Sequence, residues 1–233
     1  AVANELLSEY QGFIQTDGYE IYEAVTSRRS DIILVGCMAH ARRKFDEAVK
    51  AQGNKGKSKV GKAMMGLSFI QKLYRIEKAI KDAPAEERYK VRQEQASPVL
   101  DDLHIWLEKS LPEVPPGSAS GKALNYLHNQ WGKLIRYIDD GRLSIDNNAT
   151  ERAIKPFVIG RKNWLFSDTV KGAKASANIY SLIETAKVNG LEPYHYLRYV
   201  FKELPKAETL DQIEQLLPFN VEIENLTDTE TPR

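Results

Sequence analysis

Residues 146–152 read DNNATER, and the prediction of the fold starts from them. The Asp-Asn-Asn cluster offers side chains that cap helices, so we expect a helix to begin at Asn147 or Asn148. Helical spacing then places Asn147, Glu151 and Lys155 on one polar stripe. The opposite, apolar face consists of Ala153, Ile154, Phe157 and Val158. Pro156 is expected to end or kink this helix.

Glu151 on this stripe has two interpretations. In the first it completes a capping box, in which Asn148 is the cap and the Glu151 carboxylate reaches back to the cap N–H. In the second it is a functional carboxylate presented at the start of a helix. The residues around Glu151 leave both interpretations open.

A second acidic residue, Asp17, follows a short β-rich run at residues 13–16. Asp-Gly after such a run indicates a strand that stops at a turn, with a helix after it from about Tyr19 to Ser27. The apolar run at residues 31–37 then predicts a parallel strand covered on both faces. Ligands bind at the carboxyl edge of such sheets, where Asp17 would lie, although Asp is also common in turns for geometric reasons.

Five blocks of sequence, taken in order, resemble the insertion-sequence-66 family of bacterial transposases. They are QTDGY at 15–19, GCMAHARRKF at 36–45, GRL at 141–143 with DNNATERAIKP at 146–156, GRKNWLF at 160–166, and SLIETAK at 181–187 with NGLEPY at 189–194. Order and spacing agree to about residue 204. The resemblance implies a DDE transposase with an RNase H-like core and three catalytic carboxylates, of which Asp17 is the second Asp and Glu151 is the Glu.

The resemblance is incomplete at the amino-terminal side. Only sixteen residues precede Asp17, so no residue can be assigned to the family's first Asp. We therefore expect this chain to be the C-terminal part of a transposase, without the first three strands of the core. With one carboxylate missing, we expect the chain alone to be inactive or nearly so.

The predicted fold is α/β and helix-dominated, with a partial RNase H-like core that a large all-α insertion interrupts. Helical spacing recurs at roughly 60–82, 84–110 and 118–140, after a basic, glycine-containing linker at 53–59. The aromatic residues of these helices are better explained as core than as base-stacking platforms. The expected divisions are 1–45 for the partial core, 46–140 for the insertion, 141–190 for the return with Glu151, 191–220 for C-terminal helices and 221–233 for a flexible tail.

Cys37 and His40 form a Cys-x-x-His pair, which is half of a zinc site. A structural zinc site needs four ligands, and the chain contains no second cysteine. The family resemblance suggests instead that the pair shapes the catalytic site, with a chemical role that the sequence does not define.

DNA is the partner that the resemblance implies, together with Mg²⁺ or Mn²⁺, two ions in the complete enzyme. Basic and amide side chains near the two carboxylates are the candidates for DNA contact, although charges on a helix are more often a solvated face. The candidates are Arg42, Arg43, Lys44, Asn147, Asn148, Arg152, Lys155, Arg161 and Lys162. By the same resemblance we expect a homo-oligomer in the complete protein, accessory proteins of the same element, and a place in the bacterial cytoplasm at the nucleoid.

Composition adds few constraints. The net charge of +1 across 233 residues means that any DNA contact must come from local patches. One cysteine gives no internal disulfide, and no apolar run is long enough to span a membrane. The best-supported function is metal-dependent cleavage and strand transfer at transposon ends. The alternatives are a non-catalytic DNA-binding or transposase-interacting remnant and an RNase H-like nuclease.

Overall fold

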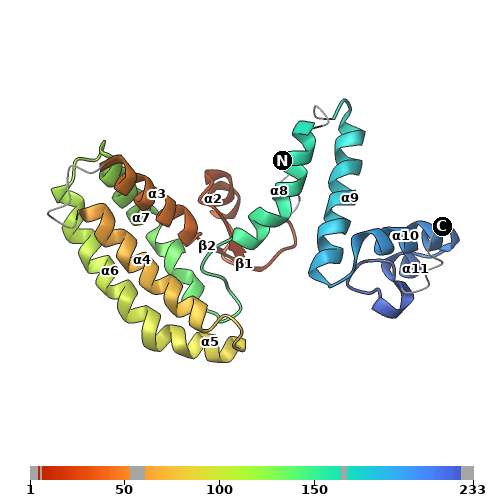
Figure 1. The fold of residues 1–233 in the computed structure, drawn as a ribbon, viewed down its shortest axis with the longest axis horizontal. Helices are drawn as coiled ribbons and strands as arrows, with labels where there is room; N and C mark the ends of the chain where they lie inside the picture. The colour runs from red at the N-terminus through yellow and green to blue at the C-terminus, as the bar shows by residue number, and fades with distance from the viewer. Residues whose placement is uncertain (1–4, 6, 53–60, 164–166, 227–233) are drawn as a thin grey trace. The chain divides into compact units, whose positions relative to one another are not determined.

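The computed structural model describes residues 5, 7–52, 61–163 and 167–226. The chain divides into two compact units, Ala1–Ala149 and Thr150–Arg233 (Figure 1). Helices dominate both units, and the first also contains a small parallel sheet. The predicted helix-dominated α/β class is therefore confirmed.

The sheet of the first unit is a βαβ arrangement. Strand β1 (Gly12–Gln15) leads through helix α2 (Glu20–Thr26) to strand β2 (Ile32–Val35), and the two strands pair in parallel. The register joins Gly12 to Ile32 and Gln15 to Val35, so both strands end at the same edge. The turn after β1 uses Gly18 at φ +90°, a conformation that L side chains rarely adopt. Both predicted strands and the helix between them are confirmed.

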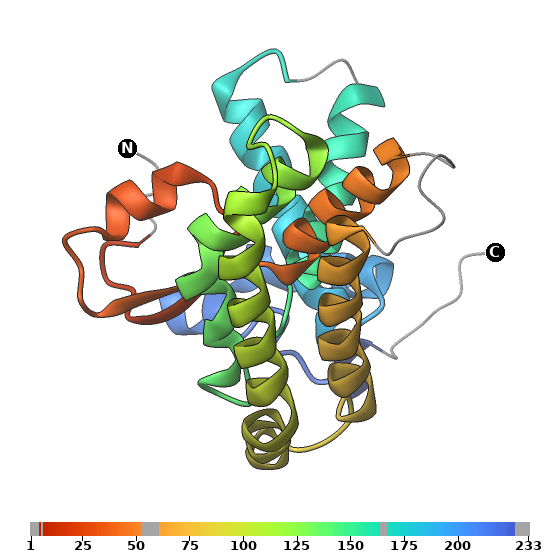
Figure 2. The same cartoon turned by 90° about the vertical axis from the view of Figure 1, so that its left-hand side faces the viewer.

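Helix α3 (Met38–Gln52) leaves β2 and is followed by a group of helices that we call the helical block. Figures 1 and 2 show α3, α4, α6 and α7 running alongside one another, and α3 packs against both α4 and α7. The block consists of α4 (Lys62–Ala79), α5 (Ala85–Val91), the π-helical turn η2 (Arg92–Ala96), α6 (Ser97–Ser110), the 3-10 turn η3 (Leu111–Glu113), α7 (Ala119–Leu134) and the 3-10 turn η4 (Ile135–Ile138). The three helical stretches expected between residues 60 and 140 are confirmed.

One apolar core joins the sheet to the helical block. Val35, the last residue of β2, and Met38, the first residue of α3, belong to the same buried cluster as Phe45, Leu73 and Leu127. Trp106 packs at 6.3 Å from Phe45, and Trp131 stacks at 4.7 Å on His104, each distance measured between ring centroids. These aromatic side chains serve the core, as predicted.

A buried arginine closes the end of the helical block. The guanidinium of Arg92 is fully buried and donates to both carboxylate oxygens of Glu77, at 2.8 and 2.7 Å. It also donates to the backbone carbonyls of Tyr137, Asp140 and Leu143, at 2.8, 3.0 and 2.9 Å. Arg92 therefore joins α4 and η2 to the segment that brings the chain back towards the sheet.

That returning segment passes α5 at Gly141. A Cβ placed on Gly141 would lie 1.7 Å from the carbonyl oxygen of Ala85, closer than any side chain allows. The GRL sequence at 141–143 therefore begins with glycine for a steric reason.

The second unit contains a helical hairpin and a small C-terminal bundle. Its helices are α8 (Asn148–Asn163, whose first two residues belong to the first unit), α9 (Val170–Val188), α10 (Pro193–Glu203), the 3-10 turn η5 (Leu204–Lys206), α11 (Leu210–Glu214) and the 3-10 turn η6 (Ile223–Leu226). Phe157 of α8 meets Tyr180 of α9 edge to face at 5.3 Å. Helix α9 ends at Val188. Gly190 follows with φ +75°, and the N–H of Leu191 donates to the Ala186 carbonyl at 2.9 Å, which closes a left-handed turn after the helix.

One alternative expected for these helices is wrong. Helix α8 begins at Asn148, as predicted, but Pro156 does not end it, and the helix continues to Asn163. Proline removes one intrahelical hydrogen bond, and here turns on both sides carry the helix across it. Helix α9 begins at Val170, where the Thr169 hydroxyl caps it by accepting from the Gly172 N–H at 3.0 Å.

The C-terminal bundle closes around Tyr196. Its hydroxyl donates to the Leu216 carbonyl at 2.9 Å, and Val200 and Val221 are buried in the same cluster. The described chain thus packs beyond residue 220, where we placed the start of a tail.

Two sequence predictions fall on residues outside the described part of the chain. They are the linker at 53–59 and the tail from residue 227 onward.

Replacing Arg92 with methionine should destabilise the first unit by about 3 kcal/mol, because the Glu77 carboxylate stays buried and loses its bidentate partner. We expect the lower end of the usual range because Arg88 Nη2 lies 3.7 Å from the same carboxylate. Urea unfolding measures the change. The control Arg75→Met, at an exposed position on α4, should change stability by less than about 0.5 kcal/mol.

The double variant Arg92→Met/Glu77→Leu should recover much of the loss, since it leaves no unpaired buried charge. A loss for Arg92→Met no larger than that of the control would contradict the role of the pair.

Candidate active site

Asp17 lies in the turn that follows β1, at the carboxyl edge of the sheet, and is exposed. Its Oδ1 accepts the N–H of Tyr19 at 3.0 Å, which closes an Asx turn. Within the described part of the chain, its Oδ2 accepts no hydrogen bond. The carboxylate is therefore held at one oxygen and open to a ligand at the other.

The segment that returns from the helical block is bound to this same edge. Gln15 Nε2 donates to the Ser144 carbonyl at 2.7 Å, and the N–H of Met38 donates to the Ile145 carbonyl at 3.0 Å. The N–H of Asn147 then donates to Cys37 Sγ at 3.4 Å. Three positions of the segment are thereby fixed at the ends of β1 and β2.

Asp146 fixes the start of helix α8. Its Oδ1 accepts the backbone N–H of Asn148 at 3.2 Å, and its Oδ2 accepts the Asn148 side-chain amide at 2.8 Å. Oδ2 also accepts the hydroxyl of Tyr74, on α4, at 2.8 Å. In the structure the N–H of Asn148 thus donates to Asp146, whereas the predicted capping box assigned this N–H to Glu151.

Glu151 lies in the first turn of α8, is half-buried, and belongs to the second unit. The predicted burial of its helix is wrong at one position. Ile154, expected on the buried face, is 53% exposed within this chain. The expected polar stripe includes Lys155, which is exposed.

Cys37 is buried at the carboxyl end of β2, and His40 is half-buried in the first turn of α3. Burial raises the pKa of the Cys37 thiol, with a smaller opposite effect from the Asn147 N–H. The thiol is therefore protonated at neutral pH, and its sulfur serves as a hydrogen-bond acceptor for the returning chain. Cys37 thus holds Asn147 in place, which gives a structural role to half of the Cys-x-x-His pair.

Helix α7 covers the turn that carries Asp17. The Tyr126 hydroxyl donates to the Asp17 carbonyl at 3.2 Å, and the side chain of Gln130 packs over Gly18. Burial, with smaller contributions from Cys37 and Asp17, raises the pKa of Tyr126 to about 12. The hydroxyl therefore remains a hydrogen-bond donor across the physiological range.

The basic cluster on α3 is exposed, as a DNA contact requires. Arg42, Arg43 and Lys44 all face solvent in the two turns after Met38. The Arg42 guanidinium lies over the ring of Tyr74, 5.3 Å from its centroid, a cation–π contact that limits its orientation.

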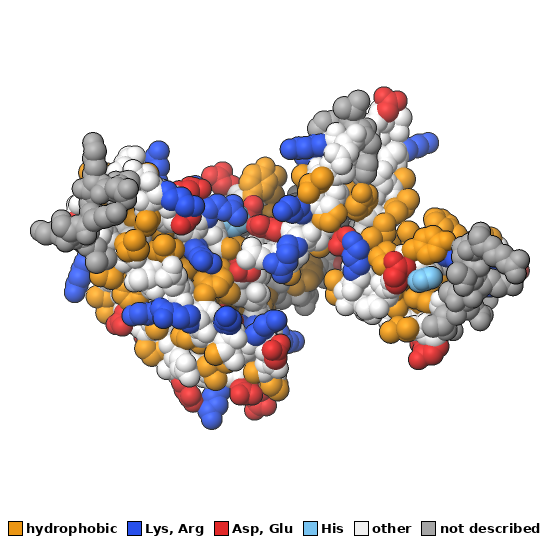
Figure 3. All heavy atoms as spheres, viewed as in Figure 1, with side chains coloured by type: hydrophobic (Ala, Val, Ile, Leu, Met, Phe, Trp, Pro, Cys, Tyr) orange, Lys and Arg blue, Asp and Glu red, His pale blue; other side chains and the backbone are white. Residues whose placement is uncertain are grey.

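The second set of basic candidates lies on α8. Arg152 and Lys155 line a groove of about 440 Å³ together with Ile159 and Tyr180. Arg161 and Lys162 are exposed in the last turn of the helix. Figure 3 shows basic side chains along the α8–α9 hairpin and over the helical block.

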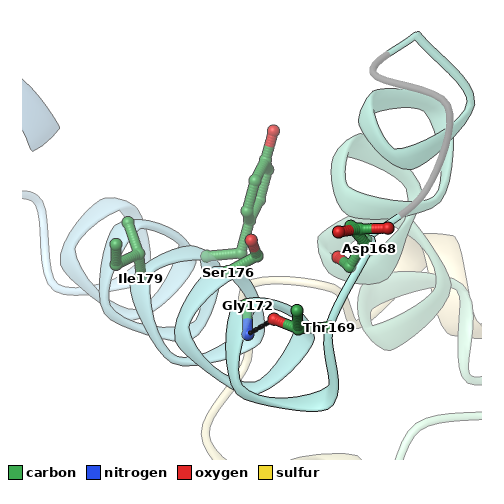
Figure 4. A pocket seen from close by; sticks show the side chains of 7 residues that line it. Asp168, Thr169, Gly172, Ser176 and Ile179 are labelled. Carbon is green, nitrogen blue, oxygen red and sulfur yellow. Dashed lines mark hydrogen bonds between the residues drawn. The ribbon is translucent and has the colours of Figure 1, made fainter.

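Another hollow of about 440 Å³ lies at the start of α9 (Figure 4). Asp168, Ser176 and Ile179 line it, with the capping pair Thr169 and Gly172 at its base. None of the site residues predicted from the sequence lines this hollow, so we assign it no role in the chemistry of the two carboxylates.

Sequence reasoning missed four residues that hold the site together: Gln15, Tyr74, Tyr126 and Asp146. Gln15 and Asp146 stood within the sequence blocks that identified the family, so a signal for them existed. Tyr74 and Tyr126 are each one apolar-patterned residue among many in long helices. Only the packing of the helical block against the sheet identifies these two.

Residues 1–175 match the family described as Transposase IS66 family, and residues 181–219 match its partner, the IS66 C-terminal element. The chain belongs to the IS66 transposase family. This confirms the resemblance that the five sequence blocks indicated.

Three proteins of Sinorhizobium fredii, each described as an uncharacterized protein, are similar to this chain. The chain is 34% identical to y4jD over 94% of its own length and 43% of that protein, and 33% identical to y4qI over 92% and 40%. It is 32% identical to y4hP over 91% and 40%. The IS66-family chain thus spans less than half the length of these relatives. No solved structure matched it.

Among the helices of the described residues, none combines the length and the apolar character that crossing a bilayer requires.

The buried thiol offers a direct test of the edge geometry. Because Cys37 is the only cysteine and is 1% exposed, a thiol reagent such as DTNB should react with the native IS66-family chain at least about a hundredfold more slowly than with the urea-unfolded chain. The Ser30→Cys variant, placed in the turn before β2, provides a reactive control. Equal labelling rates for native and unfolded wild type would contradict a buried Cys37.

Proposed function

We propose that this chain carries two of the three catalytic carboxylates of a DDE transposase, with Asp17 as the second Asp and Glu151 as the Glu. The complete protein would cut DNA at transposon ends and join the freed 3′ ends to target DNA. In this proposal residues 1–45 and 141–190 contribute to an RNase H-like core, and residues 46–140 form an insertion in it.

The observation that carries this proposal is the binding of the returning segment to the sheet edge. Gln15, Met38 and Cys37 hold residues 144, 145 and 147, and helix α8 begins at the next residue, Asn148. Helix α8, which bears Glu151, therefore begins at the same carboxyl edge of the sheet at which the turn with Asp17 lies. Glu151, the proposed catalytic Glu, lies three residues along this helix, within its first turn.

The donor atoms of the first unit at this edge suit a hard divalent cation. Asp17 contributes an exposed carboxylate, and the side-chain Oδ1 of Asn147 is buried without a hydrogen-bond partner among the described residues. Carboxylate and amide oxygens are ligands that Mg²⁺ and Mn²⁺ accept, whereas the protonated thiol of Cys37 is not. When bound, such ions lower the pKa of the attacking water and stabilise the leaving oxygen.

The remaining candidates position the nucleic acid. Arg42, Arg43 and Lys44 face solvent on the helix that starts at the site edge, where phosphate contacts would fix the register of the DNA. Arg152 and Lys155 form a separate basic surface on α8. We further propose that the complete protein acts as an oligomer on paired transposon ends in the bacterial cytoplasm, with accessory proteins of the same element.

One observation favours a second candidate, a non-catalytic binding remnant. The Asx turn of Asp17 gives this residue a purely structural reason to be present. In that case the chain would bind DNA or a longer transposase and would have no metal-dependent activity.

Metal binding separates the two candidates. If the proposal holds, Asp17→Asn and Glu151→Gln should each weaken Mn²⁺ binding at least tenfold in isothermal titration calorimetry, because each removes a charged oxygen ligand. The controls Asp101→Asn and Glu87→Gln, at exposed positions on α6 and α5, should not change it. Unchanged Mn²⁺ affinity in both site variants would favour the remnant.

The purified 233-residue chain should show no robust Mg²⁺-dependent cleavage of DNA, because two carboxylates do not complete the ligand set for two ions. Cleavage at rates typical of a complete transposase would refute this expectation, and cleavage without joining would indicate a nuclease of RNase H type.

DNA affinity should depend on salt through the basic candidates. Arg42→Ala and Arg152→Ala should each reduce the slope of log affinity against log salt by about 1, since each removes one phosphate contact. Fluorescence anisotropy with a duplex at several salt concentrations measures the slope. Lys202→Ala, at an exposed position on α10, is the matched control and should leave the slope unchanged.

A further inference from the structure

Two tyrosine hydroxyls connect the helical block to the turn that carries Asp17 and to the loop that leads into α8, the helix that carries Glu151. Tyr74, on α4, donates to the Asp146 carboxylate at 2.8 Å, two residues before α8 begins. Tyr126, on α7, donates to the Asp17 backbone carbonyl at 3.2 Å. These contacts join residues 72 and 109 positions apart in the chain, so the fold and not local sequence creates them.

The contact at Tyr74 determines how Asp146 faces the helix. The same carboxylate oxygen, Oδ2, accepts both the Tyr74 hydroxyl and the Asn148 side-chain amide, while Oδ1 accepts the Asn148 N–H. Burial, and then the hydrogen bond to Asp146, raise the pKa of Tyr74, so the hydroxyl stays a donor. With both oxygens occupied, Asp146 has little rotational freedom, and the first residue of α8 is fixed from α4.

The contact at Tyr126 acts on the other loop. The turn at Asp17 and Gly18 is followed by helix α2 and is exposed at the Asp17 side chain. Tyr126 holds its carbonyl, and Gln130, one helical turn further along α7, packs against Gly18. The turn is thus fixed from α7 by its backbone, which leaves the Asp17 carboxylate free of that contact.

We propose that the helical block is a positioning device for the active site, in which Tyr74 sets the origin of the helix bearing Glu151 and Tyr126 sets the turn bearing Asp17. The inference rests on the proposed function, because it gives the two loops a shared chemical task. Neither tyrosine is a catalytic residue, since each acts through another residue.

The cation–π contact extends this device towards DNA. Arg42 lies over the face of the Tyr74 ring whose hydroxyl holds Asp146. A phosphate bound by Arg42 would therefore be two side-chain contacts away from the start of α8. The ring and the hydroxyl of Tyr74 have separable roles, since phenylalanine keeps the first and leucine removes both.

The test compares Tyr74→Phe and Tyr126→Phe with Tyr89→Phe, a matched control because Tyr89 is 45% exposed on α5. Two quantities are measured in the 233-residue chain: amide hydrogen exchange resolved by residue, and Mn²⁺ affinity by calorimetry. Tyr74→Phe should speed exchange at Asn148 about tenfold, and Tyr126→Phe should do the same in the turn at residues 17–19, since each loses a hydrogen bond that fixes its loop.

Each variant should also weaken Mn²⁺ binding by about three- to tenfold, with unchanged exchange in the core of α6. A merely structural role would raise exchange throughout the unit and leave Mn²⁺ affinity unchanged in the folded protein. Local exchange and Mn²⁺ affinity both equal to those of Tyr89→Phe would overturn the proposal. Tyr74→Leu should in addition lower DNA affinity, and equal DNA affinity for Tyr74→Phe and Tyr74→Leu would overturn the link through Arg42.

The outcomes also separate this inference from the proposed function. If wild type binds no Mn²⁺ but local exchange still rises in the two variants, the positioning contacts are real and the metal chemistry is refuted. If wild type binds Mn²⁺ through Asp17 and Glu151 but the tyrosine variants match the control, the function stands and the positioning role is refuted.

Discussion

The first unit depends on one buried cation. Arg92 has no access to solvent, and its charge is tolerated only because Glu77 and three backbone carbonyls surround it. Those carbonyls belong to the stretch that leaves α7 and leads to the DNNATER segment. An ion pair between two helices thus also determines where the chain emerges for its return to the sheet. Every contact at the sheet edge, from Ser144 to Asn148, follows from that exit point.

Much of this arrangement could be predicted from the amino-acid pattern, because it rests on local rules. Alternation and an Asp-Gly turn identified β1, a continuous apolar run identified β2, and an Asp-Asn-Asn cap identified the start of α8. The expected helix end at Pro156 was wrong because helix propensity counts one lost hydrogen bond, whereas this helix has turns on both sides of the proline. The predicted burial of Ile154 was wrong because helical spacing shows which residues share a face but not whether another element covers that face.

The contacts that organise the candidate site were beyond such rules. Tyr74 and Tyr126 are ordinary members of an apolar helical pattern, and only their hydroxyl groups distinguish them from phenylalanine. Whether a hydroxyl meets a partner depends on the packing of α4 and α7 against segments more than seventy residues away in the chain. The family resemblance named the carboxylates as candidates, yet it contained no statement about what holds them. The sequence blocks identify the candidate catalytic carboxylates. The hydrogen bonds that hold the segments near them are formed by tertiary packing.

The close packing at Gly141 restricts which amino acids this position can accept. The backbone passes the start of α5 so closely that any side chain at this position would meet the Ala85 carbonyl. A family member with another residue there must have moved α5, and with it the helix that supports Arg92. The position therefore serves as a diagnostic in related genes: a residue other than glycine marks a copy in which this junction has been rebuilt or is decaying.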